Sequence, residues 1–258
     1  MNNFNTAWIT GTPRTGSMWT TNVIREIFKS KEFDVYPKEQ LQNDTDWEQL
    51  YQTTALNDKN EKNKYVIKTH TILKPGLPNS KYITNARNPF DICASYYEFM
   101  QCDINSAINC GLSQKNILGH YESFEDGSFF VVQYERLESS PTELISNLAK
   151  FLECEISYEK AELISQKLSK QKVKWLISNT DAKLNKKISK NKEINENEIV
   201  HLSGENYRAF NLDTGFQTGH VSNRKSGQWR QSFSKDEITE IIDALDACAL
   251  DLGYDSER

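Results

Sequence analysis

The sequence lacks long hydrophobic runs, and its cysteines and histidines form no ligand pattern. No apolar stretch in the 258 residues approaches membrane-spanning length, so we expect neither a membrane span nor a signal peptide. The five cysteines are odd in number and include no C-x-x-C pair, and the four histidines have no metal-ligand spacing with them. We therefore predict a cytoplasmic protein with reduced thiols and without a metal site.

The chain also lacks an excess of positive charge. Lys and Arg number 31 against 36 Asp and Glu, which gives a formal net charge of −5. We therefore expect no general attraction to nucleic acid or to a membrane surface, and any anion site must be locally basic. The length and the 37% of hydrophobic residues suit one large domain over residues 1–258.

Apolar runs and amphipathic segments alternate along the chain. Apolar runs bounded by turn residues predict strands at 7–10, 64–70, 81–86 and 129–135. Apolar residues at helical spacing predict helices at 17–31, 46–56, 89–100, 103–123, 141–152, 158–172 and 234–252. This alternation predicts an α/β fold with a P-loop-like, mostly parallel sheet. Helices should cover both faces, and a ligand should bind at the carboxyl ends of the strands.

Local signals mark where three of these helices begin. Asn88 suits an N-cap with Pro89 at the first helical position, and capping-box patterns start at Ser140 and Ser234. By contrast, residues 173–222 show no periodic pattern and are rich in Asn, Lys, Glu and Ser. A connection of this length inside one domain is usually a functional or mobile loop.

A glycine-bounded loop, Gly11 to Gly16, joins the first predicted strand to the first predicted helix. This arrangement directs backbone N–H groups and a helix N-terminus at a phosphate. The Gly-x4-Gly spacing is that of a P-loop, but Ser17 and Met18 stand where a Walker motif has Lys and Ser/Thr. The only cation inside the loop is Arg14. The loop therefore predicts phosphate binding without a metal-bound triphosphate.

Polar residues also follow the other predicted strands. Lys68 and His70 end the second strand, Arg87 ends the third with Ser95 two helical turns further on, and Tyr134 lies at the end of the fourth. A basic loop at 223–230 follows later in the chain. Each feature alone has an ordinary explanation, such as a hydrogen-bonded core residue or a solvated charge cluster. Together they should converge at one edge of the sheet.

Five motifs in order resemble those of the cytosolic-type sulfotransferases that use 3′-phosphoadenosine 5′-phosphosulfate (PAPS), and in particular their bacterial branch. Residues 11–19, Gly-Thr-Pro-Arg-Thr-Gly-Ser-Met-Trp, resemble the 5′-phosphosulfate loop T-Y-P-K-S-G-T-x-W, with Arg14 in place of Lys. Residues 68–70 match the K-T-H segment, and Arg87 with Ser95 matches the 3′-phosphate motif. Residues 134–135 match the start of Y-E-D.

The resemblance implies transfer of a sulfuryl group from PAPS to a hydroxyl or amine of a small molecule. The product nucleotide is 3′,5′-ADP (PAP), and no metal is required. His70 would be the base of an in-line transfer, and Arg14 and Lys68 would stabilise the leaving phosphate. Trp19 would lie beside the adenine or in the core. The implied donor-binding residues are Arg14, Thr15, Gly16, Ser17, Met18, Trp19, Arg87, Ser95, Tyr134, Arg224, Lys225, Ser226 and Gly227.

The basic loop near residue 225 can be aligned in two ways. It resembles the family's R-K-G-x-x-G-x-W motif, another 3′-phosphate contact, but is two residues shorter. Either Arg224 and Lys225 are the basic pair, or 227–229 anchors the motif and places Ser222 and Asn223 there. The sequence is compatible with both alignments.

The acceptor should contact the segments that match the family least, 31–63, 101–124 and 173–222, and the last of these would be an acceptor-site lid. The form of the first loop resembles bacterial enzymes that tailor secondary metabolites. A small-molecule kinase of the P-loop class is the main alternative, although the Walker Lys is missing. A non-catalytic nucleotide-binding protein is the third. The dimerisation motif of animal members is not found, so the sequence predicts no oligomeric state.

Overall fold

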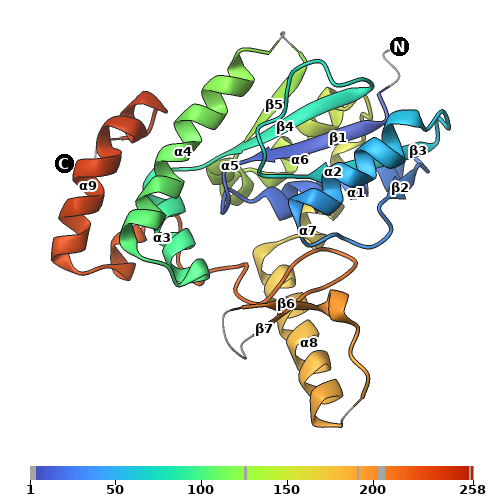
Figure 1. Ribbon diagram of the computed structural model, residues 1–258. Helices are drawn as coiled ribbons and strands as arrows, with labels where there is room; N and C mark the ends of the chain where they lie inside the picture. The colour runs from blue at the N-terminus through green and yellow to red at the C-terminus, as the bar shows by residue number, and fades with distance from the viewer. Residues whose placement is uncertain (1–3, 125–126, 191, 203–206, 256, 258) are drawn as a thin grey trace.

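A five-stranded parallel sheet forms the centre of the computed structural model, which describes residues 4–124, 127–190, 192–202, 207–255 and 257. The strand order is β2-β3-β1-β4-β5, so the first long strand lies in the middle (Figure 1). β1 pairs in parallel with β3 and β4, and β4 pairs with β5. The sheet strands are β1 (Thr6–Gly11), β2 (Asp34–Tyr36), β3 (Asn63–Lys68), β4 (Ser80–Ala86) and β5 (Phe129–Gln133).

Helices cover both faces of this sheet, as the sequence predicts. Alternate residues of a strand point to opposite faces, and in β1 Ala7 and Ile9 join one buried cluster while Trp8 joins another. The first cluster includes residues of α1, α6 and α7, and the second includes residues of α2 and α4. The helices are α1 (Ser17–Ser30), α2 (Asp44–Thr53), α3 (Pro89–Met100), α4 (Ile104–Glu122), α5 (Tyr134–Ser139), α6 (Pro141–Phe151), α7 (Tyr158–Lys167), α8 (Lys170–Ser189) and α9 (Lys235–Asp251).

A third buried cluster lies beside the sheet rather than on it. α3, α4 and α9 pack together there, around Phe90, Trp229 and Leu245. The Trp229 ring stacks on the Phe90 ring at a centroid distance of 4.9 Å. Because α3 starts directly after β4, this packing fixes the helix whose first turns reach the carboxyl edge of the sheet.

The segment 173–222 is only partly irregular, so the expectation of a long loop is wrong for its first third. α8 continues to Ser189. Its few apolar residues are widely spaced along the helix, and one of them, Leu184, packs in a small cluster with Ile199 and Ala209. The last two belong to a short antiparallel pair, β6 (Ile199–His201) and β7 (Tyr207–Ala209), which lies beside α8 away from the main sheet (Figure 1). Residues 191 and 203–206 of this segment lie outside the described residues.

Other local features also differ from the sequence-based expectation. The strand predicted to end at residue 135 ends at Gln133, because Tyr134 already begins α5. The helix predicted at 158–172 is two helices, α7 and α8, separated at 168–169. The capping box predicted at Ser140 does not form, since α5 runs almost into α6 and Glu143 pairs with Arg136 instead. The box at Ser234 is confirmed.

Within the described part of the chain, no helix has both the length and the apolar composition needed to cross a membrane. In the same residues, His, Cys, Asp and Glu form no group of three or more that could hold a metal ion.

Candidate active site

The predicted site residues follow adjacent strands, and their parallel direction brings them to one edge of the sheet. Loop 12–16 follows β1, residues 69–70 follow β3, Arg87 follows β4 and Tyr134 follows β5. Since β3, β1, β4 and β5 are consecutive in the sheet, these segments are spatial neighbours. This is where ligands bind in open parallel sheets.

Loop 12–16 leaves the N-terminus of α1 open to an anion. Gly16 is the N-cap residue with φ 92°, in the left-handed region, and as a glycine it has no side chain with which to cap the helix. A Cβ built on Gly16 would lie 3.1 Å from Cδ2 of Tyr134, so the close approach of that ring also requires glycine. Ser17 begins the helix, and Thr15 Oγ1 donates to the Thr12 carbonyl at 2.7 Å, which closes the turn. The loop has the geometry of a phosphate site.

Arg14 is held by neutral partners instead of a carboxylate. Its Nε donates to Ser95 Oγ at 3.1 Å, and its Nη2 donates to the carbonyl of His220 at 3.2 Å. Its Cζ lies 3.9 Å from the centroid of the Phe99 ring. Burial, together with the charge of Arg87, lowers the pKa of Arg14 to about 9, so the group remains protonated at neutral pH. Among the described residues it has no ion pair, so its charge is available to a bound anion.

Arg87 contacts the same loop from the next strand. Its Nη1 donates to the carbonyl of Arg14 at 2.9 Å, and its Cζ lies 4.0 Å from the centroid of the Tyr134 ring. The backbone N–H of Arg87 donates to Gln114 Oε1 at 2.9 Å, which fixes the end of β4. The Nε of Arg87 is buried and has no partner among the described residues. Arg14, Arg87, Ser95 and Tyr134 are therefore brought together.

His70 and Lys68 form a second pair at the end of β3. His70 Nδ1 lies 2.8 Å from the carbonyl of Gly11, and a carbonyl can only accept, so Nδ1 carries the proton. Nε2 is then the acceptor, 3.0 Å from Lys68 Nζ. Burial and the Lys68 charge lower the pKa of His70 to about 4, and burial lowers the pKa of Lys68. The imidazole is therefore neutral at pH 7, with its tautomer fixed and Nε2 directed toward the cation.

Asp44, the first residue of α2, links this pair to the 31–63 segment. Its Oδ2 accepts the backbone N–H of His70 at 2.8 Å. Its charge raises the pKa of both Lys68 and His70, against the larger effect of burial. The segment that matches the family least therefore does reach the predicted base.

Three residues at the site were not predicted from the sequence: Phe99, Arg208 and His220. Arg208 Cζ lies 3.8 Å from the centroid of the Phe99 ring, and its Nη2 donates to the Phe99 carbonyl. The His220 ring lies 5.3 Å from that ring, and burial together with Arg14 and Lys68 lowers the pKa of His220. None of the three belongs to one of the five motifs. Phe99 lies on a helix that the sequence predicts, α3, whereas no sequence signal placed Arg208 or His220.

In the basic loop at 223–230, Arg224 packs against the site, whereas the Lys225 side chain is exposed. Arg224 donates to Glu98 and to Ser232, and its side chain is only 6% exposed. Its Nε and Nη2 are buried without a described partner. Burial raises the pKa of Asp91, while the charges of Arg87 and Arg224 lower it, so both arginines lie near that carboxylate.

The remaining predicted residues take structural positions around these groups. Gly227 N–H donates to Asp91 Oδ2 at 2.8 Å, and Ser226 Oγ donates to Glu138 Oε2 at 2.6 Å. Trp19 is 7% exposed and its Nε1 donates to the Leu168 carbonyl at 3.2 Å, so the core position is the one that the structure shows. Met18 packs toward Gly215, in the segment that covers the loop.

The fold and the site define an α/β protein with cationic side chains gathered at the carboxyl edge of its parallel sheet. The chain matches the sequence model of the sulfotransferase domain family over residues 5–209, and it therefore belongs to that family. A search of curated proteins found no match.

Solved structures share the fold at low sequence identity. A retinol dehydratase in complex with androsterone and the inactive cofactor PAP is 14% identical, with a TM-score of 0.58 over 98% of this chain and 82% of its own. A mouse sulfotransferase complexed with PAP is 12% identical, with a TM-score of 0.60 over 97% and 88% of the two chains. At this identity the likeness is one of fold.

Proposed function

We propose that the protein transfers the sulfuryl group of PAPS to a hydroxyl or amine of a small molecule and releases PAP. The observation that carries the proposal is a set of three cations beside the open N-terminus of α1: Arg87, which is buried, and Arg14 and Lys68, which are half-buried. A partly buried cation without an anionic partner is costly, and Arg14 forms no ion pair among the described residues. The family match and the two PAP-bound structures of the same fold support PAPS as the anionic partner.

The two phosphate ends of the donor would bind to different groups. The 5′-phosphosulfate would lie over loop 12–16, where the N–H groups of α1 and the Arg14 guanidinium are directed. The 3′-phosphate would lie between Arg87 and Arg224, because both have buried N–H donors without partners. Tyr134, which stacks on Arg87, would then be near the adenine. This favours the alignment in which Arg224 is the first residue of the basic pair.

His70 would take the proton of the acceptor as its oxygen or nitrogen attacks sulfur. Its Nε2 is an acceptor in the tautomer fixed by Gly11. As the new bond to sulfur forms, the bond from sulfur to the 5′-phosphate oxygen breaks, and that oxygen keeps the electron pair. Lys68, now 3.0 Å from His70, would turn to this oxygen as the acceptor takes its place. The anionic donor would also raise the pKa of His70, because it offsets the charges that lower it.

The reaction needs no metal ion in this scheme. A transferring sulfuryl group carries less negative charge than a phosphoryl group, and Arg14, Lys68 and the backbone N–H groups supply fixed positive charge where the leaving oxygen develops its own. The chain has five cysteines, all unpaired, which suits a cytoplasmic location.

The acceptor would approach between the segments that cover His70. Asp44 comes from 31–63 and His220 from 173–222, and both reach the site. The carbonyls of Gly219 and His220 contact Arg14, and Arg208 lies over the same Phe99 ring as Arg14. We therefore propose that residues 207–220, within 173–222, are the acceptor-site lid. In the third variable segment, 101–124, Gln114 exchanges hydrogen bonds with the backbone N–H and carbonyl of Arg87.

Calorimetry with PAP tests the proposal without knowledge of the acceptor. We expect PAP to bind to the protein in the absence of divalent metal, and ATP with Mg²⁺ not to displace it. Failure of PAP to bind at tens of micromolar would contradict the proposal. Displacement of PAP by ATP with Mg²⁺ would favour a kinase instead.

A further inference from the structure

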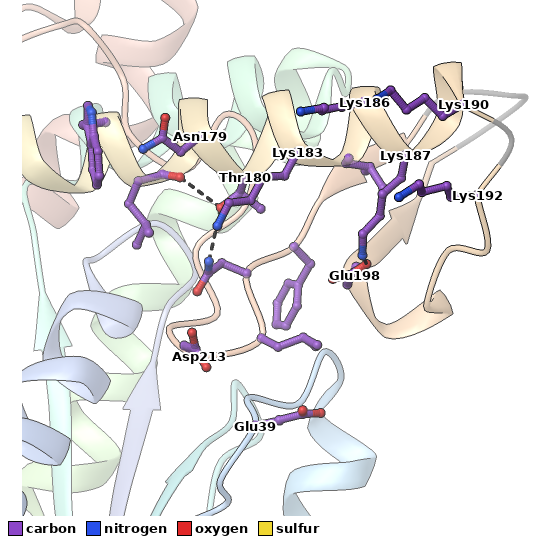
Figure 2. Close-up of a pocket in the computed structure, with 16 residues that line it drawn as sticks. Glu39, Asn179, Thr180, Lys183, Lys186, Lys187, Lys190, Lys192, Glu198 and Asp213 are labelled. Carbon is purple, nitrogen blue, oxygen red and sulfur yellow. Dashed lines mark hydrogen bonds and ion pairs between the residues drawn. The ribbon is translucent and has the colours of Figure 1, made fainter.

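A cavity separate from the candidate active site lies between α8 and the residues after β7. Its volume is about 490 Å³, within the range of small-molecule sites. α8 forms one wall, and residues 210–213 with Glu39 form the other (Figure 2). None of the residues predicted to bind the donor or to act in catalysis lines it.

The α8 wall carries a concentrated positive charge. Segment 170–192 contains eight lysines and a single acid, Asp181, in a chain whose net charge is −5. Lys187 pairs with Glu198 across the cavity. The other lining lysines have no ion pair with any residue in the described part of the chain; they are Lys183, Lys186, Lys190 and Lys192.

Favourable interaction with the helix dipole explains the positions of only some of these lysines. Cations stabilise a helix end when they lie in its last turn, where Lys186 and Lys187 are. Lys183 lies before that turn, and like charges three and four residues apart on a helix repel one another. The row of lysines therefore disfavours the helix by itself, and a bound anion would relieve that repulsion.

The rest of the cavity is unsuited to a continuous polyanion. Glu39 and Asp213 lie on the side opposite the lysines (Figure 2), where they would repel closely spaced phosphates but can accept hydrogen bonds from hydroxyl groups. Trp175 also lines the cavity and is 64% exposed, which leaves a flat apolar surface beside the charges. A ligand that fits has sparse anionic groups, many hydroxyls and one apolar face.

We propose that this cavity binds an acidic saccharide. Its carboxylate, sulfate or phosphate groups bind Lys183, Lys186 and Lys190, and the C–H face of a sugar ring packs on Trp175. Its hydroxyls donate to Glu39 and Asp213. Use of this saccharide as the acceptor rests on the proposed transfer reaction, whereas its binding does not.

Contacts between α8 and the segment over Arg14 connect the two sites. Asn211 Nδ2 donates to Thr180 Oγ1 at 3.2 Å, and Thr218 Oγ1 donates to Asp181. Two residues further on, the carbonyl of His220 accepts from Arg14. The wall of the cavity and the cover of Arg14 are therefore one continuous stretch, 210–220, along which a saccharide chain can extend toward the donor.

Calorimetry with tetragalacturonate, a chain of four uronic acids, tests the proposal. We expect the protein to bind it, and the variant Lys183→Gln/Lys186→Gln/Lys190→Gln to bind it at least about tenfold more weakly. The matched control Lys59→Gln/Lys62→Gln/Lys235→Gln removes the same charge from exposed lysines that do not line the cavity, and it should bind like the original protein. Trp175→Ala should weaken binding and Trp175→Phe should largely restore it.

Several results would overturn the saccharide site. These are no binding of tetragalacturonate, equal losses in the cavity variant and the matched control, binding of the uncharged maltotetraose with similar affinity, or equal competition by tripolyphosphate. PAP titrated into the same samples should bind equally to every variant. If PAP fails to bind while tetragalacturonate binds as expected, the proposed function is wrong and the saccharide site stands.

Discussion

Two cationic regions of this protein differ in how their charges are held. At the candidate active site the Arg87 side chain is buried, and Arg14 is fixed by a hydroxyl, two carbonyls and an aromatic ring. At the α8 cavity four of the five lining lysines are exposed, on α8 or just after its end. A buried, positioned charge acts in a low dielectric and acts strongly, whereas an exposed flexible one is screened by water and salt. The first arrangement suits catalysis and the second suits the anchoring of a ligand.

The largest expected effect is at His70. We predict that His70→Ala lowers turnover at least ~100-fold while leaving PAP affinity unchanged, because the imidazole acts on the acceptor proton and not on the nucleotide. Turnover with labelled PAPS and calorimetry with PAP measure the two quantities. His201→Ala, which removes an exposed histidine paired with Glu196, is the control and should retain full activity. Unchanged turnover in His70→Ala would remove His70 from the mechanism, whereas PAP binding without turnover in either protein would favour the non-catalytic nucleotide-binding alternative.

Arg87→Ala tests whether a buried cation recognises the 3′-phosphate. We expect a loss of about 10- to 100-fold in PAP affinity, from a charge-assisted hydrogen bond of ~1.5–3 kcal/mol. Adenosine 5′-phosphosulfate lacks the 3′-phosphate, so its affinity should fall much less. Arg136→Ala, in which an exposed ion pair with Glu143 is lost, serves as the control. Equal losses for the two nucleotides would show that Arg87 only supports loop 12–16.

The two regions also differ in how far the sequence predicts them. The sheet, its direction and the convergence of Arg14, His70 and Arg87 follow from strand periodicity and from motifs at strand ends. These are local patterns. The cover of Arg14 by residues 207–220 depends on contacts such as Arg208 with Phe99, which are 109 residues apart. No local sequence pattern predicts such a contact.

Helix α8 also depends on contacts between residues far apart in the sequence, so it too is poorly predicted. Its apolar residues are few, so its helical periodicity is weak, and the sequence predicts an irregular segment. It is helical because Leu184 packs on β6 and β7, a pair of strands too short to be recognised in the sequence. The lysines are evident in the sequence. That they line one wall of a cavity follows only from the helical structure of the segment.

The pH dependence of the reaction tests the electrostatic state of the buried region. With the pKa of His70 near 4 in the free protein, the neutral base persists well below its ordinary pKa of about 6.5, so kcat/KM should decline only as the pH falls through about 4 to 5. A decline centred near pH ~6.5 would show that the imidazole is neither buried nor close to Lys68 in solution.

The same lowered pKa makes folding depend on pH. Between the folded value of about 4 and the unfolded value near 6.5, the unfolded state binds more protons, so stability falls as the pH is lowered through this window. Urea denaturation at the two ends of the window, with His70→Asn as the comparison, should show a smaller loss in the variant. An identical pH dependence in both proteins would contradict the assignment of the shift to His70.

The smallest expected effect separates the two regions by their response to salt. Raising KCl from about 50 to about 500 mM shortens the screening length from roughly 14 Å to roughly 4 Å. Tetragalacturonate bound to exposed lysines should then lose a larger factor in affinity than PAP, whose phosphates contact buried arginines and backbone N–H groups. Calorimetry of each ligand across the salt series measures both slopes. A steeper salt dependence of affinity for PAP would mean that the donor site is open to solvent when occupied. The cations of the two regions would then be equally screened in the bound state.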